Sequence, residues 1–443
     1  MEVFVKIAQL LLSLSILVIL HEAGHFMFAK LFKTRVEKFY LFFDPWFSLL
    51  KFKKGETEYG IGWVPLGGYV KISGMIDESM DKEQMKKPAK PWEFRSKPSW
   101  QRLIIMLGGV MVNFLLAIII YIMVLFVWGE EYLPSENVKY GILVDSVGME
   151  MGLRNGDNIL SVDNQEIDNF YQIIPDIVLN ERKTIQLKRD GRLMEVKIPE
   201  ESIPFLIKGK GRIDVRTPFS PLVVADFIKE SPAKNAGLKT GDEILGLNNE
   251  NYKYYDQFKK KLNESIGEEV LLQIKRNSNN LEIPVVVNNQ GMIGISISRD
   301  IKDFFEFRKI KYGFFESIPA GIAKGVTTLQ DYLKQIKLIF SKDTKAYESL
   351  GGFITIGSIF PGVWDWHAFW NLTAFLSIIL AIMNVLPIPA LDGGHVMFLL
   401  YEVVTGRKPG DKFMEYAQMT GMIIILALLL FANGNDLIRW FNK

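Results

Sequence analysis

Four long apolar segments constrain the fold of this chain more than any other feature of its sequence. They cover residues 7–29, 103–128, 369–391 and 416–432. The second carries no charged residue and is longer than the roughly 20 residues that a helix needs to cross a bilayer. The mean hydropathy of +0.13 is high for a chain with 23% charged residues, so the apolar residues must be concentrated in a few places. We therefore expect a polytopic α-helical membrane protein with four transmembrane helices.

The distribution of lysine and arginine predicts the orientation of these helices. Many basic residues lie between the first two apolar segments, from Lys30 to Arg102, and Lys86 and Lys87 are among them. Such an excess marks a cytoplasmic loop. Four spans then place both termini, and the hydrophilic region from about 129 to 368, on the opposite side. No basic leader or small-residue cleavage site accompanies the first segment, so we expect it to be retained as an anchor.

The composition excludes some kinds of chemistry. The chain has no cysteine, so disulfides and thiolate ligands are excluded and any metal must be held by His, Asp or Glu. The net charge is only +2 and no basic stripe is present, so we expect no nucleic-acid partner.

The first apolar segment contains a metal-binding motif. His21 and His25 are four residues apart, and a helix places both on one face, within reach of one zinc ion. Glu22, next to the first histidine, could take a proton from a zinc-bound water. The alternative is a pair of histidines that pack and hydrogen-bond between helices. Polar groups inside an apolar span are costly unless they are paired or functional, so their position favours catalysis.

A third ligand is expected from the segment that runs from Asn384 to His395. Pro387 and Pro389 cannot both lie in an unbroken helix. Irregular backbone at membrane depth is tolerated only where protein or a water-filled cavity shelters it. Asp392 would project from this break as a candidate ligand.

The hydrophilic region contains an internal repeat. Residues 152–164 recur 85 positions later as residues 237–249, with a Gly-Asp turn that leads into a short apolar strand in each copy. The pattern resembles a PDZ domain, and the second copy is the fuller match. PDZ domains bind extended peptides by adding a strand to a sheet edge, so we expect two PDZ domains that bind peptides or sieve substrates. A generic small β domain is the alternative.

Two further segments carry a structural prediction. Residues 59–64 and 69–72 are expected to form a membrane-associated β-hairpin around a Pro-Leu-Gly-Gly turn. Its exposed edge could hold an unwound substrate, and packing against the spans is the alternative. Residues 312–341 have apolar residues at helical spacing, which is typical of a helix at the membrane surface or of one that packs against the second repeat.

Together, the motif at His21 to His25, the segment from Asn384 to Gly394 and the repeat resemble the site-2 protease family of intramembrane zinc metalloproteases, in its bacterial branch. The resemblance runs nearly from end to end and includes residues 65–71, which match the membrane-dipping β-segment of that family. The chain departs from the family at residues 108–114 and 351–353, where relatives usually have Gly-Pro and Ser-Gly-Pro.

The resemblance implies that His21, His25 and Asp392 hold one zinc ion and that Glu22 is the general base. It implies that Asn384 binds the substrate backbone, near the oxyanion that develops during hydrolysis. The β-segment is expected to contact the substrate through Ile61, Trp63, Gly67, Gly68 and Tyr69. His395 could support Asp392 or pack within the helix that restarts there.

The family further implies a multi-pass protein of the bacterial cytoplasmic membrane, with its active site toward the cytoplasm. Its expected substrates are single-span membrane proteins, such as trimmed anti-sigma factors or remnant signal peptides. The PDZ domains would bind peptide or trimmed ectodomain termini, or exclude bulky ones.

These predictions divide the chain into eight parts. They are transmembrane helices at 1–32, 103–128, 369–398 and 399–443, a cytoplasmic β-segment and loop at 33–102, PDZ domains at 129–215 and 216–300, and amphipathic surface helices at 301–368.

Two other functions compete with this one. The first is a membrane PDZ scaffold with a structural metal site, and Glu22 argues against it because a structural zinc needs no base. The second is a membrane protease that trims prenylated or soluble peptides, and such enzymes typically take a glutamate from a downstream helix as the third ligand.

Overall fold

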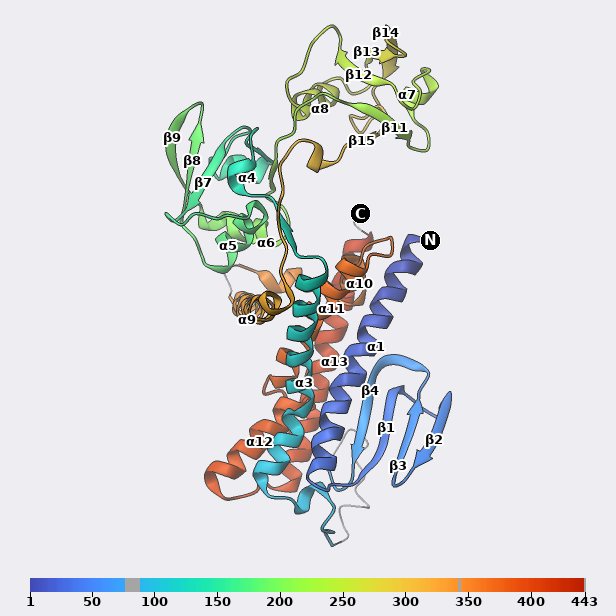
Figure 1. Ribbon diagram of the computed structural model, residues 1–443, viewed down its shortest axis with the longest axis vertical. Helices are drawn as coiled ribbons and strands as arrows, with labels where there is room; N and C mark the ends of the chain where they lie inside the picture. The colour runs from blue at the N-terminus through green and yellow to red at the C-terminus, as the bar shows by residue number, and fades with distance from the viewer. Residues whose placement is uncertain (76–87, 342–343, 442–443) are drawn as a thin grey trace. The chain divides into compact units, whose positions relative to one another are not determined.

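The computed structural model describes residues 1–75, 88–341 and 344–441 (Figure 1). Lys86 and Lys87 of the predicted basic loop lie outside these ranges. The chain divides into two compact units, which we call the helical unit and the repeat unit. The helical unit comprises Met1–Gly129, Lys311–Lys337 and Tyr347–Lys443, and the repeat unit comprises Glu130–Ile310 and Leu338–Ala346.

The helical unit contains the predicted long helices. Four helices within the described residues are long and apolar enough to cross a membrane, which confirms the number expected from the sequence. They are α1 (Glu2–Leu31), α3 (Ser99–Val127), α11 (Trp366–Val385) and α13 (Asp411–Phe441). α3 packs against both α1 and α11, and a buried cluster around Ala117, Ile120 and Ile378 joins α3 to α11. The N-terminal end of α1 and the C-terminal end of α13 lie at the same end of this unit (Figure 1).

The third span is shorter than predicted. α11 ends at Val385, and a separate helix, α12 (Asp392–Thr405), begins after six residues without helical structure. The predicted break at the prolines is confirmed, and it divides residues 369–398 between two helices. Proline has no N–H to donate and its ring clashes with the preceding turn, so neither Pro387 nor Pro389 can continue α11.

A four-stranded sheet lies beside α1 in the helical unit. Its strands are β1 (Val36–Phe43), β2 (Leu50–Lys54), β3 (Thr57–Ile61) and β4 (Val64–Ile72), in the order β2-β3-β1-β4. The prediction that residues 59–64 and 69–72 pair as one hairpin is wrong, because β1 lies between β3 and β4. Gly62 lets the chain cross the end of β1, since a Cβ there would lie 2.1 Å from the carbonyl oxygen of Phe43.

Two further helices complete the helical unit. α9 (Phe314–Ile339) confirms the predicted helical spacing and packs against α3, where Gly321 fits directly over the backbone of Ile122. α10 (Phe353–Ile359) is tied to α13 because the carboxylate of Asp436 accepts hydrogen bonds from the amides of Gly352 and Thr355, both at 3.0 Å.

The repeat unit has two separate hydrophobic cores, one for each copy of the repeat. The first copy contains a three-stranded sheet in the order β7-β8-β9 and a two-stranded sheet of β6 and β10. The second copy contains a five-stranded sheet in the order β14-β13-β12-β11-β15. β5 (Glu130–Tyr132) and β16 (Arg308–Ile310), which flank the repeat, pair with each other.

The first copy comprises β6 (Ile142–Val144), α4 (Ser146–Glu150), β7 (Asn158–Val162), α5 (Ile173–Leu179), β8 (Thr184–Arg189), β9 (Arg192–Lys197), α6 (Ile203–Ile207) and β10 (Ile213–Val215). The second comprises β11 (Val223–Phe227), α7 (Pro232–Asn235), β12 (Glu243–Leu247), α8 (Tyr255–Glu264), β13 (Glu269–Arg276), β14 (Asn279–Val286) and β15 (Ile295–Ser298).

The repeated Gly-Asp turn makes the same interaction in both copies. Asp157 accepts two hydrogen bonds of 2.7 Å from Arg189, and Asp242 accepts two of 2.7 Å from Arg276. Each carboxylate also accepts a bond from the backbone amide three residues before it, at 2.8 Å. The sequence repeat therefore corresponds to a repeated structure, and its identity as a pair of PDZ domains stays a prediction.

Candidate metal centre

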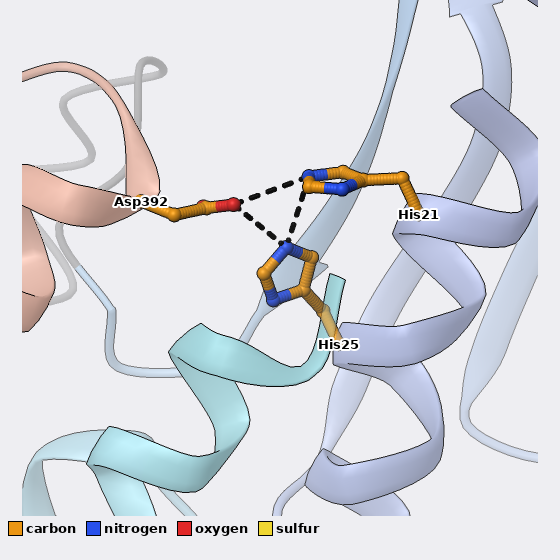
Figure 2. Close-up of side chains that lie close together, drawn as sticks. All are labelled: His21, His25 and Asp392. Carbon is orange, nitrogen blue, oxygen red and sulfur yellow. Dashed lines mark hydrogen bonds and ion pairs between the residues drawn. The ribbon is translucent and has the colours of Figure 1, made fainter. Parts of the chain in front are cut away.

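The centre of the helical unit holds the two histidines of the motif. His21 and His25 lie one turn apart on α1 and point the same way (Figure 2), and their exposed fractions are 7% and 4%. Asp392, the first residue of α12, faces them from the other side (Figure 2). Among the described residues, these three form the one group that could hold a metal ion.

The three potential ligand atoms fit one tetrahedral ion. Oδ2 of Asp392 lies 3.1 Å from Nε2 of His21 and 3.2 Å from Nε2 of His25, and the two Nε2 atoms are 3.3 Å apart. Zinc bound to nitrogen and oxygen at about 2.0 Å in a tetrahedron places its ligands about 3.3 Å from one another. The observed triangle therefore has the size that a shared zinc requires.

The carboxylate of Asp392 supports the same conclusion. Its Oδ2 atom is buried and has no hydrogen-bond partner among the described residues. Its close neighbours are the two histidine nitrogens, and a bound cation would be shared by all three atoms. The donor set of two imidazoles and one carboxylate is one that zinc accepts. The residues present therefore fit a zinc ion.

The broken segment before α12 is shaped so that Asp392 reaches the histidines. Gly393 and Gly394 let the first turn of α12 pack on the chain before it, since a Cβ at either position would lie within 2.5 Å of backbone atoms. Gly421 lets α13 pack closely on the broken segment, since a Cβ there would lie 1.6 Å from the carbonyl oxygen of Pro389. The Asp-Gly-Gly sequence thus serves close packing as well as ligation.

α1 and α3 approach each other closely beside the histidines. A Cβ on Gly24 would lie 2.3 Å from the carbonyl oxygen of Gly108, and a Cβ on Gly109 would lie 2.5 Å from Nε2 of His25. The Nδ1 atom of His25 lies 2.8 Å from the carbonyl oxygen of Ile105. The amide of Asn113 lies 3.1 Å from Nδ1 of His21. α3 therefore contacts both imidazoles.

A cavity of about 640 Å³ opens beside the three ligands. Glu22, Gly68, Tyr69 and Asp44 are among the residues that line it. β4 lies beside Glu22 at Gly68, where a Cβ would be in ordinary van der Waals contact with Cγ of the glutamate, at 3.7 Å. Tyr69 is held in place by a 2.8 Å hydrogen bond that its hydroxyl donates to Asp44. Glu22 and the edge of β4 therefore face the same cavity.

The other predicted site residues divide into two groups. Asn384 lies at the centre, with Nδ2 3.3 Å from Nε2 of His21. Ile61 and Gly67 lie on strands of the sheet and Trp63 lies between β3 and β4, but none of the three is among the residues that line the cavity. Trp63 instead stacks on Phe47, with 5.7 Å between the ring centroids.

His395 lines the cavity, one turn along α12 from Asp392. Its Nε2 atom lies 3.0 Å from Nε2 of Gln418, on α13. This contact joins α12 to α13.

Sequence reasoning did not assign a role to Asn113, Gly109 or Gly24. The amide of Asn113 lies in an otherwise apolar span, and a polar residue in such a span indicates a functional role. This signal could have identified Asn113. The glycines gave no such signal, because their role depends on how closely two distant helices approach.

Comparisons with known proteins agree with this geometry. The model of Peptidase family M50 matches residues 9–428. A putative zinc metalloprotease of Borreliella burgdorferi is 31% identical over 444 residues, which cover 96% of each chain. The regulator of sigma E protease of Haemophilus influenzae is 28% identical and covers 98% of this chain and 99% of its own. Protease RseP of Yersinia pestis is 26% identical over 99% of this chain and 100% of its own.

Proposed function

The chain belongs to peptidase family M50 and is a zinc metalloendopeptidase, and we propose that it cleaves peptide bonds within the transmembrane segments of single-span membrane proteins. The observation that carries this proposal is the position of the ligand triangle. The three ligand atoms come from α1 and from the start of α12, within a unit that holds four helices able to span a membrane. A protease site inside such a unit meets substrates that are themselves in the membrane.

The proposed roles of the residues follow from their positions. His21, His25 and Asp392 hold one zinc ion per chain. Zinc in such a site lowers the pKa of a bound water and polarises the scissile carbonyl. Glu22 lines the same cavity and accepts the proton of the attacking water. Asn384 presents its amide beside the ligands, where an amide N–H can donate to the oxyanion.

We propose that β4 holds the substrate in an extended form. A transmembrane helix resists hydrolysis because its backbone groups are hydrogen-bonded to one another, so cleavage requires local unwinding. β4 is the terminal strand of its sheet and lies beside Glu22 at Gly68. An unwound substrate that pairs with this edge would have its backbone hydrogen bonds satisfied while it is cleaved.

The repeat unit is proposed to select the substrate. If its two copies are PDZ domains, they bind the termini of trimmed ectodomains or exclude untrimmed ones. Two of the relatives are named for the regulation of sigma E or as RseP, and we propose substrates of the same class, such as trimmed anti-sigma factors, with remnant signal peptides as a second class.

The proposed location is the cytoplasmic membrane of a bacterium. The excess of basic residues between α1 and α3 supports a cytoplasmic location for that loop. Both termini and the repeat unit are then extracytoplasmic, and the site opens toward the cytoplasmic side.

The test uses the full chain reconstituted in liposomes with a single-span reporter protein. We expect the wild type to cut within the span, as mapped by mass spectrometry of the two fragments, and Glu22→Gln to bind zinc without cutting. Gln keeps the shape of Glu but is not a base, so the comparison of wild type with Glu22→Gln isolates the effect of proton transfer. Cleavage by Glu22→Gln at the wild-type rate, or a cut outside the span, would contradict the proposal.

A further inference from the structure

One face of α3 lies against both imidazoles of the proposed zinc site. Ile105, Gly109 and Asn113 are spaced by four residues, so a helix places them one above another on one face. All three are buried. Ile105 approaches His25 with its backbone carbonyl, and Asn113 approaches His21 with its side-chain amide. Gly109 approaches both rings because it has no side chain.

The hydrogen bond of His25 shows what a metal-binding histidine requires. A neutral imidazole has one N–H, and the other nitrogen is free to bind a metal. Nδ1 of His25 lies 2.8 Å from the carbonyl oxygen of Ile105, and a carbonyl can only accept. Nδ1 therefore carries the proton, and Nε2 is left with a lone pair that faces Asp392 and His21.

His21 needs the same arrangement, but its partner is a side chain. For Nε2 of His21 to bind zinc, Nδ1 must carry the proton and needs an acceptor. The amide of Asn113 lies 3.1 Å from Nδ1, with Nδ2 as the nearer end. Oδ1 of Asn113 is buried and has no hydrogen-bond partner among the described residues. Rotation of the side-chain amide that exchanges Oδ1 and Nδ2 would bring Oδ1 to Nδ1 of His21. This rotation breaks no hydrogen bond of Oδ1, because that atom makes none within the described residues.

We propose that Asn113 is a positioning residue for zinc, whose side-chain oxygen accepts the Nδ1 proton of His21 and thereby fixes Nε2 as the metal-binding atom. This inference rests on the zinc site proposed above. It also explains why a fully buried amide is kept in an apolar helix, where an amide without a function only adds a desolvation cost.

Gly109 leaves room for the two imidazole rings because it has no side chain. A Cβ at this position would lie 2.5 Å from Cε1 of His21 and 2.5 Å from Nε2 of His25. Such a contact cannot be relieved within a straight helix, so the rings would have to move. The three positions on α3 therefore set both the tautomer and the place of the imidazoles.

The experiment measures zinc affinity by chelator competition on the detergent-purified full chain. Asn113→Leu keeps a branched side chain of similar length but offers no acceptor, and we expect the affinity to fall about 10–100-fold, the range for lost partners of metal-bound histidines. Asn113→Asp offers only acceptors, and we expect an affinity within a few-fold of the wild type. If Asn113 only filled space, the leucine would bind zinc as tightly as the wild type, and if it donated from Nδ2, the aspartate would bind zinc as weakly as the leucine.

Ser377→Ala is the matched control. Ser377 donates a 2.7 Å hydrogen bond to the backbone carbonyl of Asn113, so its loss disturbs the same helix contact without touching an imidazole. We expect unchanged zinc affinity in this variant. A loss equal to that of Asn113→Leu would overturn the proposal, because general loosening of the contact would then explain both.

A second readout reports the tautomer directly. The chain has only four histidines, so ¹⁵N-histidine labelling gives a simple spectrum. We expect two zinc-bound imidazoles protonated at Nδ1 in the wild type, and a change in one of them in Asn113→Leu. If the wild type binds no zinc, both the zinc site and this inference fail. If it binds zinc and Asn113→Leu binds it equally well, this inference alone fails.

Discussion

Buried carboxylates behave differently in the two units of this protein. In the repeat unit, Asp157 and Asp242 are each 1% exposed, and each accepts two hydrogen bonds from an arginine and one from a backbone amide. In the helical unit, Oδ2 of Asp392 is also buried but has no hydrogen-bond partner among the described residues. Its neighbours at 3.1 and 3.2 Å are two histidine nitrogens.

The difference separates a structural carboxylate from a ligand. A buried carboxylate with a full set of donors holds its own fold together, and removing it leaves the arginine uncompensated. A buried carboxylate whose close neighbours are two histidine nitrogens can bind a cation together with them. We therefore expect the same substitution to reduce zinc binding in the helical unit and to reduce stability in the repeat unit.

The largest effect is expected for Asp392→Ala. Zinc affinity should fall by more than about 100-fold, because a ligand is lost rather than one of its supporting partners. Cleavage of the single-span reporter should become undetectable. Zinc affinity or reporter cleavage equal to that of the wild type would contradict this assignment.

A smaller effect on function and a larger one on stability are expected for Asp242→Ala. The second copy of the repeat should lose about 3 kcal/mol, because Arg276 is left without its partner. Asp157→Ala should do the same to the first copy, through Arg189. Hydrogen exchange of the full chain measures this as faster opening of β12 and β13, or of β7 and β8. Zinc content is the control and should not change in either variant.

The pair of Asp242 and Arg276 also predicts a dependence on pH. Burial acts to raise the pKa of Asp242, but the hydrogen bonds from Arg276 and from the amide of Lys239 outweigh it, so the pKa is lowered in the folded state. The stability that this carboxylate contributes is therefore present above its unfolded pKa of about 4 and is lost as the pH falls below it. Exchange of β12 amides, corrected for the intrinsic rate, should accelerate below about pH 4 in the wild type. In Asp242→Ala, this part of the pH dependence should be absent.

The smallest effect is expected for an exposed ion pair. Lys183 and Glu200 lie 2.8 Å apart with 63% and 83% of their side chains exposed. Solvent screens such pairs, so Glu200→Gln should leave the exchange of the first copy unchanged within error. A loss comparable to that of Asp157→Ala would show that burial does not explain the difference between the pairs.

Much of the helical unit could be predicted from the sequence because its signals are local. The length and apolarity of the spans, the spacing of His21 and His25, and the break at Pro387 and Pro389 each depend on a few neighbouring residues. The repeat could be found for the same reason, since Gly156-Asp157 and Gly241-Asp242 stand at equivalent positions in a repeated pattern.

The features that the sequence did not predict depend on contacts between distant segments. The order of the sheet is one, because the position of β1 between β3 and β4 depends on how the chain crosses at Gly62. The contact between α3 and the two imidazoles is another feature of this kind. Gly109 is meaningful only once α3 lies against α1, and periodicity along one helix does not show which helix it meets.

Zinc content by elemental analysis tests the central claim most directly. The measurement compares detergent-purified wild type, Glu22→Gln and Asp392→Ala as full chains. We predict one zinc ion per chain in the wild type and in Glu22→Gln, and almost none in Asp392→Ala. Full zinc content in Asp392→Ala, or none in the wild type, would contradict the account.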